Sequence, residues 1–265
     1  MTDRHLPPYW AKNFAHVDVK IRNGTAEEFK KWFSTLRDPI GELDMMKIWK
    51  GIFYAVWNCD KRPNQEILTS KIASFLEIAA STDNCAMFYR CFIRTFMREW
   101  GGVDRFRRDK FYLLFDKLNK TYFRLLHLKF QTQDFNKLYF AWYNQSFSNC
   151  KINDLPKELQ MYFFQNFHQY LDNDISSNHE EYFIKIFQDV ALIFFDPSIN
   201  LNEISDALKS LLTKIRSKRG LECIDEFFDD FYTIRVQEGK INRHISKHFR
   251  NLNNHMKNRL MSLNA

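Results

Sequence analysis

Glycine and proline are scarce in this chain, and their scarcity limits the folds open to it. The 265 residues include seven Gly and six Pro, together about 5% where average usage is roughly 12%. Tight turns and bulges depend on these residues, so the chain has little material for the turns of a β-sheet. Hydrophobic residues make up 45% of the chain, enough to bury a large core. The sequence therefore predicts an all-helical, folded protein.

Capping and turn signals divide the chain into successive helices. In "NGTAEEF", Thr25 stands three residues before Glu28, which is the spacing of a capping box and predicts a helix from Thr25 to about Leu36. The pair Gly101-Gly102 is expected to end a later helix in the left-handed conformation. The other expected helices cover about 42–58, 63–80, 83–100 and 104–127, with further ones beginning near 134, 156, 177, 197, 220 and 240.

Helices of this length, joined by short links, favour one architecture. Antiparallel hairpins stacked side by side form an α-solenoid, and neither strand alternation nor a low-complexity linker interrupts the pattern. No sequence repeat of fixed period accompanies it. We expect an all-α, HEAT-like solenoid in which residues 1–265 form a single helical-repeat domain and 239–265 a basic C-terminal helix.

The segment "KIWKGIFYAVWNCDK", residues 47–61, is rich in aromatic residues. One helical stripe, expected in the core, consists of Met45, Trp49, Ile52 and Val56. The opposite side carries Lys50, Tyr54, Trp57 and Lys61, which either pack against a neighbouring hairpin or face a partner. Gly51 inside the helix costs up to about 1 kcal/mol relative to Ala, so we expect another helix to approach closely there.

Basic residues are unevenly distributed along the chain, whose net charge is +7. In "MREWGGVDRFRRDKFYLLF", residues 97–115, the i,i+4 spacing allows local ion pairs between Asp104 and Arg108 and between Arg105 and Asp109. Alternatively, the cations surround a helix start, where free N–H groups already favour an RNA phosphate or an acidic loop. The basic candidates here are Arg98, Arg105, Arg107, Arg108 and Lys110, and those of the last helix are Arg243, Lys247 and Arg250. By contrast, "DEFFDD" at 225–230 is acidic.

Signals for catalysis, cofactors and membranes are weak. The five Cys are scattered without a C-x-x-C spacing, which indicates reduced thiols rather than disulfides or zinc. His244 and His248 are spaced i,i+4, but no H-E-x-x-H motif surrounds them. The longest apolar runs are far shorter than the ~20 residues that span a bilayer. We expect a soluble intracellular protein that is not an enzyme and has no cofactor or metal.

Two blocks in this sequence carry a family resemblance. "WKGIFYAVWNCDK" and "REWGGVDRFRRDKFYLL" resemble the nucleolar ribosomal RNA processing protein 1 (Nop52-type) family, in the same order and with a similar gap. The likeness is strongest over 1–125. Two later segments, "HEEYFIKIF" and "FFDDFYTIRVQEGKINRHI", are also similar to segments of the family. No family segment corresponds to 130–175. The basic tail usual in the family does not follow in these residues, and "KIRSKR" at 214–219 is a weak import signal.

The resemblance implies a helical assembly factor of the large (60S) ribosomal subunit precursor, located in the nucleus and nucleolus and needed for rRNA processing. Its implied partners are the pre-60S particle, pre-rRNA, ribosomal proteins, and Brix-domain and β-propeller assembly factors. The alternative is a helical-repeat adaptor that binds only proteins through apolar grooves and the acidic segment. Salt distinguishes the two, because phosphate contacts weaken steeply with ionic strength.

Overall fold

The computed structural model describes residues 7–146 and 155–171, together with Tyr182 and Ile186. The chain divides into two compact units, 1–179 and 180–265, and nearly all described residues lie in the first. The described helices are α1 (Pro7–Phe14), α2 (Val19–Phe33), α3 (Glu42–Trp57), α4 (Arg62–Ile78), α5 (Thr82–Glu99), the short 3-10 helix η2 (Trp100–Gly102), α6 (Arg108–Leu128), α7 (Gln133–Ser146) and α8 (Lys157–Leu171). A single domain over 1–265 stays a prediction.

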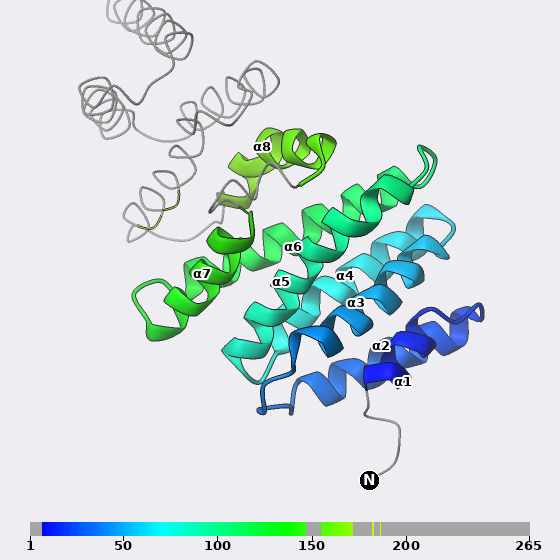
Figure 1. Ribbon diagram of the computed structural model, residues 1–265, viewed down its shortest axis with the longest axis horizontal. Helices are drawn as coiled ribbons and strands as arrows, with labels where there is room; N and C mark the ends of the chain where they lie inside the picture. The colour runs from blue at the N-terminus through cyan, green and yellow to red at the C-terminus, as the bar shows by residue number, and fades with distance from the viewer. Residues whose placement is uncertain (1–6, 147–154, 172–181, 183–185, 187–265) are drawn as a thin grey trace, which may run out of the picture. The chain divides into compact units, whose positions relative to one another are not determined.

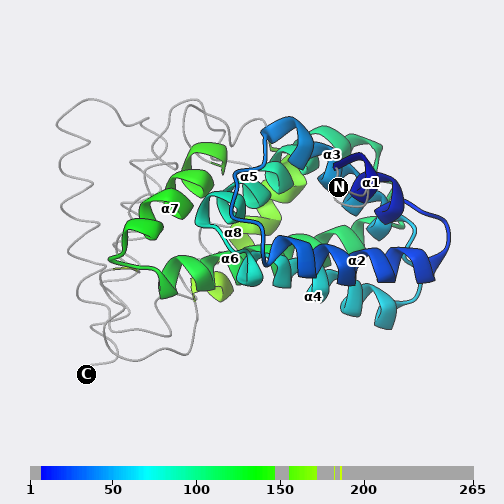
Figure 2. The same ribbon diagram turned by 90° about the horizontal axis from the view of Figure 1, so that it is seen from below.

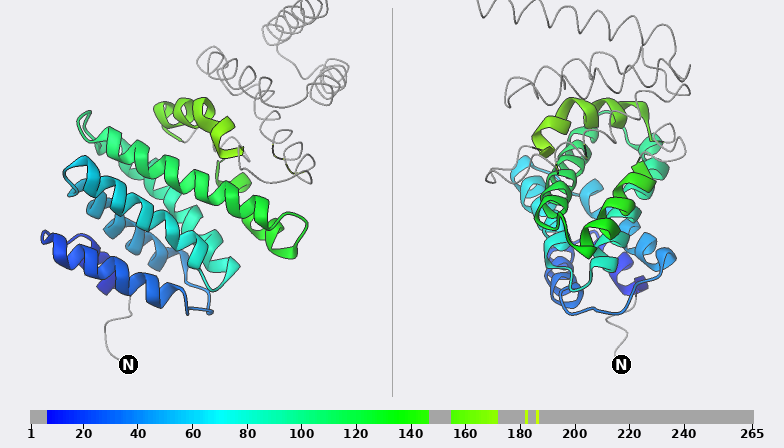
Figure 3. Two further views of the ribbon diagram at one scale, coloured as in Figure 1. Left: turned by 180° about the vertical axis from the view of Figure 1, so that it is seen from behind. Right: turned by 90° about the vertical axis from the view of Figure 1, so that its left-hand side faces the viewer.

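The helices of the first unit stack in two layers. One layer consists of α1, α3, α5 and α7, and the other of α2, α4, α6 and α8, each helix packing on the next of its layer. Figure 1 shows the hairpins following one another from α1 to α7, and the layers can be followed in Figures 2 and 3. The expected α-solenoid of helical hairpins is confirmed. No strand occurs among the residues that the structure describes.

Aromatic side chains fill the space between the layers. The predicted stripe of α3 is fully buried at all four positions, Met45, Trp49, Ile52 and Val56. The indole of Trp49 donates a hydrogen bond to the carbonyl of Phe88 over 2.7 Å, which ties α3 to α5. Phe53 stacks on Phe111 of α6 with ring centroids 4.4 Å apart. Burial of such large rings contributes strongly to stability.

Gly51 is a point of close approach between α1 and α3. A Cβ atom at this position would lie 2.5 Å from the carbonyl oxygen of Ala11 and 2.7 Å from its Cα. Both are backbone atoms, so a side chain could enter only if α1 moved. The expected close approach of another helix is confirmed.

The expected capping box is wrong. Helix α2 begins at Val19, where the side chain of Asp18 accepts a hydrogen bond from the backbone N–H of Lys20 over 2.8 Å. Thr25 lies inside the helix, and its hydroxyl donates to the carbonyl of Ile21 over 2.7 Å. The earlier Asp cap starts the helix, and Gly24 does not interrupt it.

The link between α5 and α6 also differs from expectation. No residue of Gly101-Gly102 takes the left-handed conformation. Instead α5 continues into η2, and the N–H of Val103 donates to the carbonyl of Trp100 over 2.9 Å. Helix α6 then begins at Arg108 rather than near Asp104. The helices expected from about 177 onward lie outside the described residues.

Candidate functional site

The two sequence blocks that carry the family resemblance meet at one edge of the solenoid. The first block forms the end of α3 and the link to α4, and the second forms the end of α5 and the start of α6. The guanidinium of Arg107 lies 4.8 Å from the ring centroid of Trp57, about fifty residues earlier in the chain. Helix α3 also reaches α6 through Phe111, whose ring centroid is 6.3 Å from that of Trp57.

Side chains from three helices bind the free carbonyls at the end of α3. Lys110 donates from Nζ to the carbonyls of Trp57 (2.5 Å) and Cys59 (3.1 Å). Arg22 of α2 donates to the carbonyl of Asn58 over 3.1 Å, and Gln65 of α4 donates to that of Cys59 over 3.1 Å. Cations suit this position because the carboxyl end of a helix carries partial negative charge. The link between α3 and α4 is therefore fixed in place.

Lys110 supports the site and does not offer its amine to a partner. The residue is 4% exposed, and its amine is taken up by two carbonyls. Burial lowers the pKa of Lys110, an effect that the nearby Asp60 carboxylate opposes. The sequence-based expectation that Lys110 faces an anion at the helix start does not match this placement.

The loop before α6 is fixed by Asp104. Its carboxylate accepts hydrogen bonds from the N–H groups of Phe106 (3.0 Å) and Arg107 (3.2 Å). It also pairs with the Arg107 guanidinium, and this hydrogen bond lowers the pKa of Asp104. At the tip, Phe106 is 81% exposed, with the guanidinium of Arg105 4.7 Å from its ring centroid. The loop thus holds an aromatic ring out toward solvent.

The expected i,i+4 ion pairs give way to other contacts. Asp104 pairs with Arg107 at i,i+3. Arg108 reaches Glu158 of α8 over 3.3 Å, and its guanidinium lies 5.8 Å from the ring centroid of Trp100. Because the chain turns at 104–107 before α6 begins, these side chains do not have helical spacing.

A pocket of about 490 Å³ lies between the α3–α4 link and this loop. Its lining combines cations, carboxylates, an amide and one exposed ring: Asp60, Lys61, Arg62, Gln65, Phe106, Arg107, Asp109 and Lys110. Lys61 has a φ of 63°, a conformation that glycine adopts more readily, so its backbone is strained beside the pocket.

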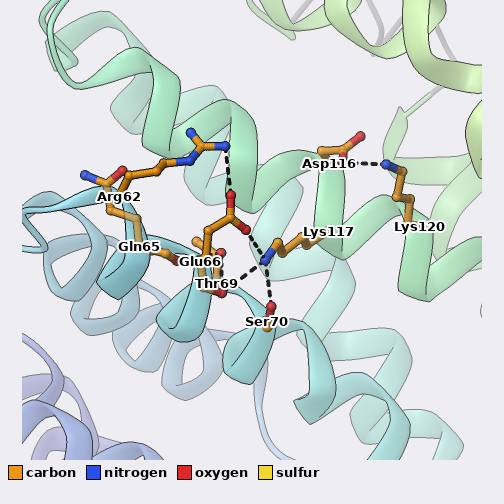
Figure 4. A network of polar contacts seen from close by, with 8 residues as sticks. All are labelled: Arg62, Gln65, Glu66, Thr69, Ser70, Asp116, Lys117 and Lys120. Carbon is orange, nitrogen blue, oxygen red and sulfur yellow. Dashed lines mark hydrogen bonds and ion pairs between the residues drawn. The ribbon is translucent and has the colours of Figure 1, made fainter.

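Arg62, at the pocket rim, belongs to a network that joins α4 and α6 (Figure 4). Its guanidinium pairs with Glu66 over 2.8 Å, and the same carboxylate pairs with Lys117 over 2.6 Å. Lys117 also donates to the Ser70 hydroxyl over 2.6 Å. The hydrogen bond from Lys117 is the main cause of the lowered pKa of Glu66.

The remaining candidates are placed as follows. Lys50, Lys61 and Arg105 are exposed, Tyr54 is 37% exposed and Trp57 is half-buried. Arg98 is exposed and pairs with Glu99 over 2.7 Å. Arg243, Lys247 and Arg250 lie outside the described residues. Of the exposed cations, Lys61 lines the pocket, while Arg105 adjoins it through the Phe106 ring.

Sequence reasoning missed Phe106, the most exposed ring at this edge. The available signal was its position: it follows Asp104 by two residues and precedes the apolar stripe of α6. An apolar residue in a loop before a helix does not belong to the buried stripe of that helix, so its side chain can be exposed. Its neighbours Asp60 and Gln65 were also missed as pocket residues.

Thiols and metal ligands offer little for catalysis in the described part of the chain. Cys59, Cys85 and Cys91 are buried, and burial raises the pKa of Cys85 and of Cys91 to about 12. Such thiols stay protonated and are poor nucleophiles. Within the same residues, no cluster of His, Cys, Asp and Glu could hold a metal ion. None of the described helices is long and apolar enough to cross a membrane.

Comparisons with known proteins give one family. The sequence model described as "Nucleolar protein, Nop52" matches residues 8–256. The chain is 30% identical over 148 residues to the Drosophila melanogaster protein named "Ribosomal RNA processing protein 1 homolog", covering 54% of this chain and 21% of that protein. It is 31% identical over 121 residues to the human "Ribosomal RNA processing protein 1 homolog B", covering 44% and 16%.

A third relative matches over a shorter stretch with a higher sequence identity. The mouse "Ribosomal RNA processing protein 1 homolog A" is 42% identical over 71 residues, which cover 27% of this chain and 14% of that protein. In each of these three comparisons the aligned part is about a fifth or less of the relative's length.

Proposed function

Because the chain belongs to the Nop52 family of nucleolar proteins, we propose that it is a non-catalytic ribosome assembly factor. It acts in the nucleolus on the large (60S) subunit precursor and is needed for rRNA processing. The observation that carries the proposal is the meeting of the two family blocks at one edge, where they and the start of α4 line a pocket with four cations and an exposed aromatic ring.

The solenoid supports a scaffold role. Stacked hairpins present long surfaces on each layer, which suit simultaneous binding of several partners. We propose pre-rRNA at the basic edge. On the remaining surface we propose ribosomal proteins and other assembly factors, including Brix-domain and β-propeller proteins.

A binding role suits the chemistry of the pocket better than catalysis. The amine of Lys110 is committed to two carbonyls, and Asp104 is committed to Arg107 and two N–H groups. A general acid or base must be free to exchange its proton with a substrate. These groups instead hold the walls of the pocket in place.

The test is co-purification of the tagged full-length protein from its own cells at low and high salt. We expect large-subunit precursor RNA and assembly factors at low salt, with progressive loss of RNA contacts as salt rises. The variant Lys61→Gln/Arg105→Gln should be retained less. The control Lys31→Gln/Lys129→Gln removes the same charge from the last turn of α2 and the end of α6.

Recovery of the assembly factors with no ribosomal precursor at any salt would contradict the proposal. That result would favour the alternative, a helical-repeat adaptor that binds only proteins. Equal loss of precursor in both double variants would also count against a role for the basic edge, because it would reflect net charge alone.

A further inference from the structure

We propose that the pocket between the α3–α4 link and the Phe106 loop receives one unpaired RNA nucleotide. The base stacks on Phe106, and its phosphate lies against Lys61 at the rim. This inference rests on the proposed function, which brings RNA to the basic edge. It further specifies that the bound RNA is single-stranded rather than duplex, and that Phe106 is the residue on which the base stacks.

Phe106 has the properties of a stacking platform. Its ring is 81% exposed, although exposing a Phe to water is unfavourable. Asp104 binds the backbone N–H groups of Phe106 and Arg107, so the ring is held in position before a ligand arrives. Arg105 lies 4.7 Å from the ring centroid and extends the platform with a second flat, cationic surface. Unpaired bases stack on aromatic rings and on guanidinium planes.

The charges of the pocket favour a nucleotide over a bare anion. Among its cations, Lys110 and Arg107 already have partners inside the protein. Arg62 is paired with Glu66, whereas Lys61 is exposed at the rim, where a phosphate can reach it. Asp60 and Asp109 repel further phosphates, and their oxygens accept hydrogen bonds from the N–H groups of a base.

The same carboxylates argue against an acidic peptide, which would face Asp60 and Asp109 and leave the Phe106 ring unused. They also argue against duplex RNA, because its base edges are already paired and buried in the grooves. The pocket volume of about 490 Å³ falls in the range of roughly 300–1,000 Å³ typical of small-molecule sites. A single base with its sugar fits such a volume.

The test is fluorescence anisotropy with the full chain. The probe is a labelled mixed-sequence RNA of about twelve nucleotides, free or annealed to its complement. We expect preferential binding of the single strand, and Phe106→Ala should weaken it roughly tenfold. Phe106→Trp should preserve binding because it keeps a ring. Lys61→Gln should lower the salt slope by about 0.7, whereas Phe106→Ala should leave the slope unchanged.

Phe140→Ala is the matched control, because Phe140 is a second exposed ring, at 54%, on α7. It should leave RNA affinity unchanged. Ultraviolet crosslinking followed by mass spectrometry should place the RNA on the peptide that contains Phe106. Circular dichroism checks that each variant is folded.

Three results would overturn the nucleotide pocket. The RNA affinity of Phe106→Ala could be unchanged, or Phe140→Ala could lose as much RNA affinity as Phe106→Ala. Alternatively, Phe106→Ala could lose a protein partner and keep its RNA affinity. In those cases the co-purification of wild-type protein with precursor particles would still support the proposed function. Conversely, Phe106-dependent RNA binding by a protein that never co-purifies with precursors would keep the pocket and remove the proposed function.

Discussion

At the scale of single residues, Lys110 shows how a family motif can have a structural role. Its charge suggested a phosphate contact, but its amine closes the end of α3, 51 to 53 residues earlier in the chain. Local spacing cannot reveal such a contact, because periodicity reports only the face of a helix on which a residue lies. The candidates Lys61 and Arg105 are exposed, and each lies before the helix that follows it, but their role in binding stays a prediction.

Lys110→Met should lower the free energy of unfolding by about 2 kcal/mol, because the carbonyl of Trp57 loses its side-chain donor and that of Cys59 keeps only Gln65. Lys50→Met, at an exposed position of α3, is the control and should change stability by no more than about 0.5 kcal/mol. Urea denaturation followed by circular dichroism measures both. Equal effects of the two substitutions would contradict the role assigned to Lys110.

The difference in the free energy of unfolding between wild type and Lys110→Met should depend on pH. Burial lowers the pKa of Lys110 in the folded state below its ordinary value. Between the two pKa values the unfolded chain binds more protons, so the contribution of Lys110 to stability increases as pH rises through that range. The gap between wild type and Lys110→Met should therefore widen in alkaline buffer. A gap that narrows would mean that the folded pKa is raised.

At the scale of elements, most helices could be predicted from the sequence. Helices α3, α4 and α5 begin and end within two residues of expectation, because apolar periodicity and proline or glycine agree there. Two starts were wrong, since Asp18 rather than Thr25 caps α2, and Asp104 caps a turn rather than α6. In both places the structure shows a carboxylate that accepts hydrogen bonds from nearby backbone N–H groups, which the capping box and the apolar pattern did not indicate.

Gly51→Ala should destabilise the protein by about 2 kcal/mol, because the new Cβ meets the backbone of Ala11 and pushes α1 away from α3. Gly24→Ala is the matched control. Gly24 lies within α2 with nothing within 4 Å of its would-be Cβ, so Ala should stabilise the helix by up to about 1 kcal/mol. Thermal or urea unfolding compares them, and effects of the same sign would refute the close contact.

At the scale of the whole molecule, the fold and the binding edge should respond differently to salt. The ion pairs that link α2, α4 and α6 are partly exposed, as in Lys71–Glu27 and Lys117–Glu66. Pairs of this kind contribute little, and the aromatic core is insensitive to ionic strength. The buried stripe of α3 was predicted from sequence, whereas these ion pairs within one layer depend on the register of neighbouring helices.

Raising sodium chloride from about 0.1 to about 0.5 M should therefore change the free energy of unfolding by less than about 1 kcal/mol. RNA affinity should fall steeply over the same range. Urea titrations at each salt concentration provide the measurement. A large loss of stability with salt would mean that release from particles reflects unfolding rather than loss of phosphate contacts.

The stacking order of the helices has a consequence for biosynthesis. Each helix makes its principal contacts with helices one or two places away in the chain. A growing polypeptide can therefore complete its first hairpins before later residues leave the ribosome, because none of the described helices has its principal contacts with a helix far along the chain. Short-range contacts also favour rapid folding. The edge formed by the two family blocks is complete once α6 has emerged, so a nascent chain can acquire its pocket before α8 leaves the ribosome.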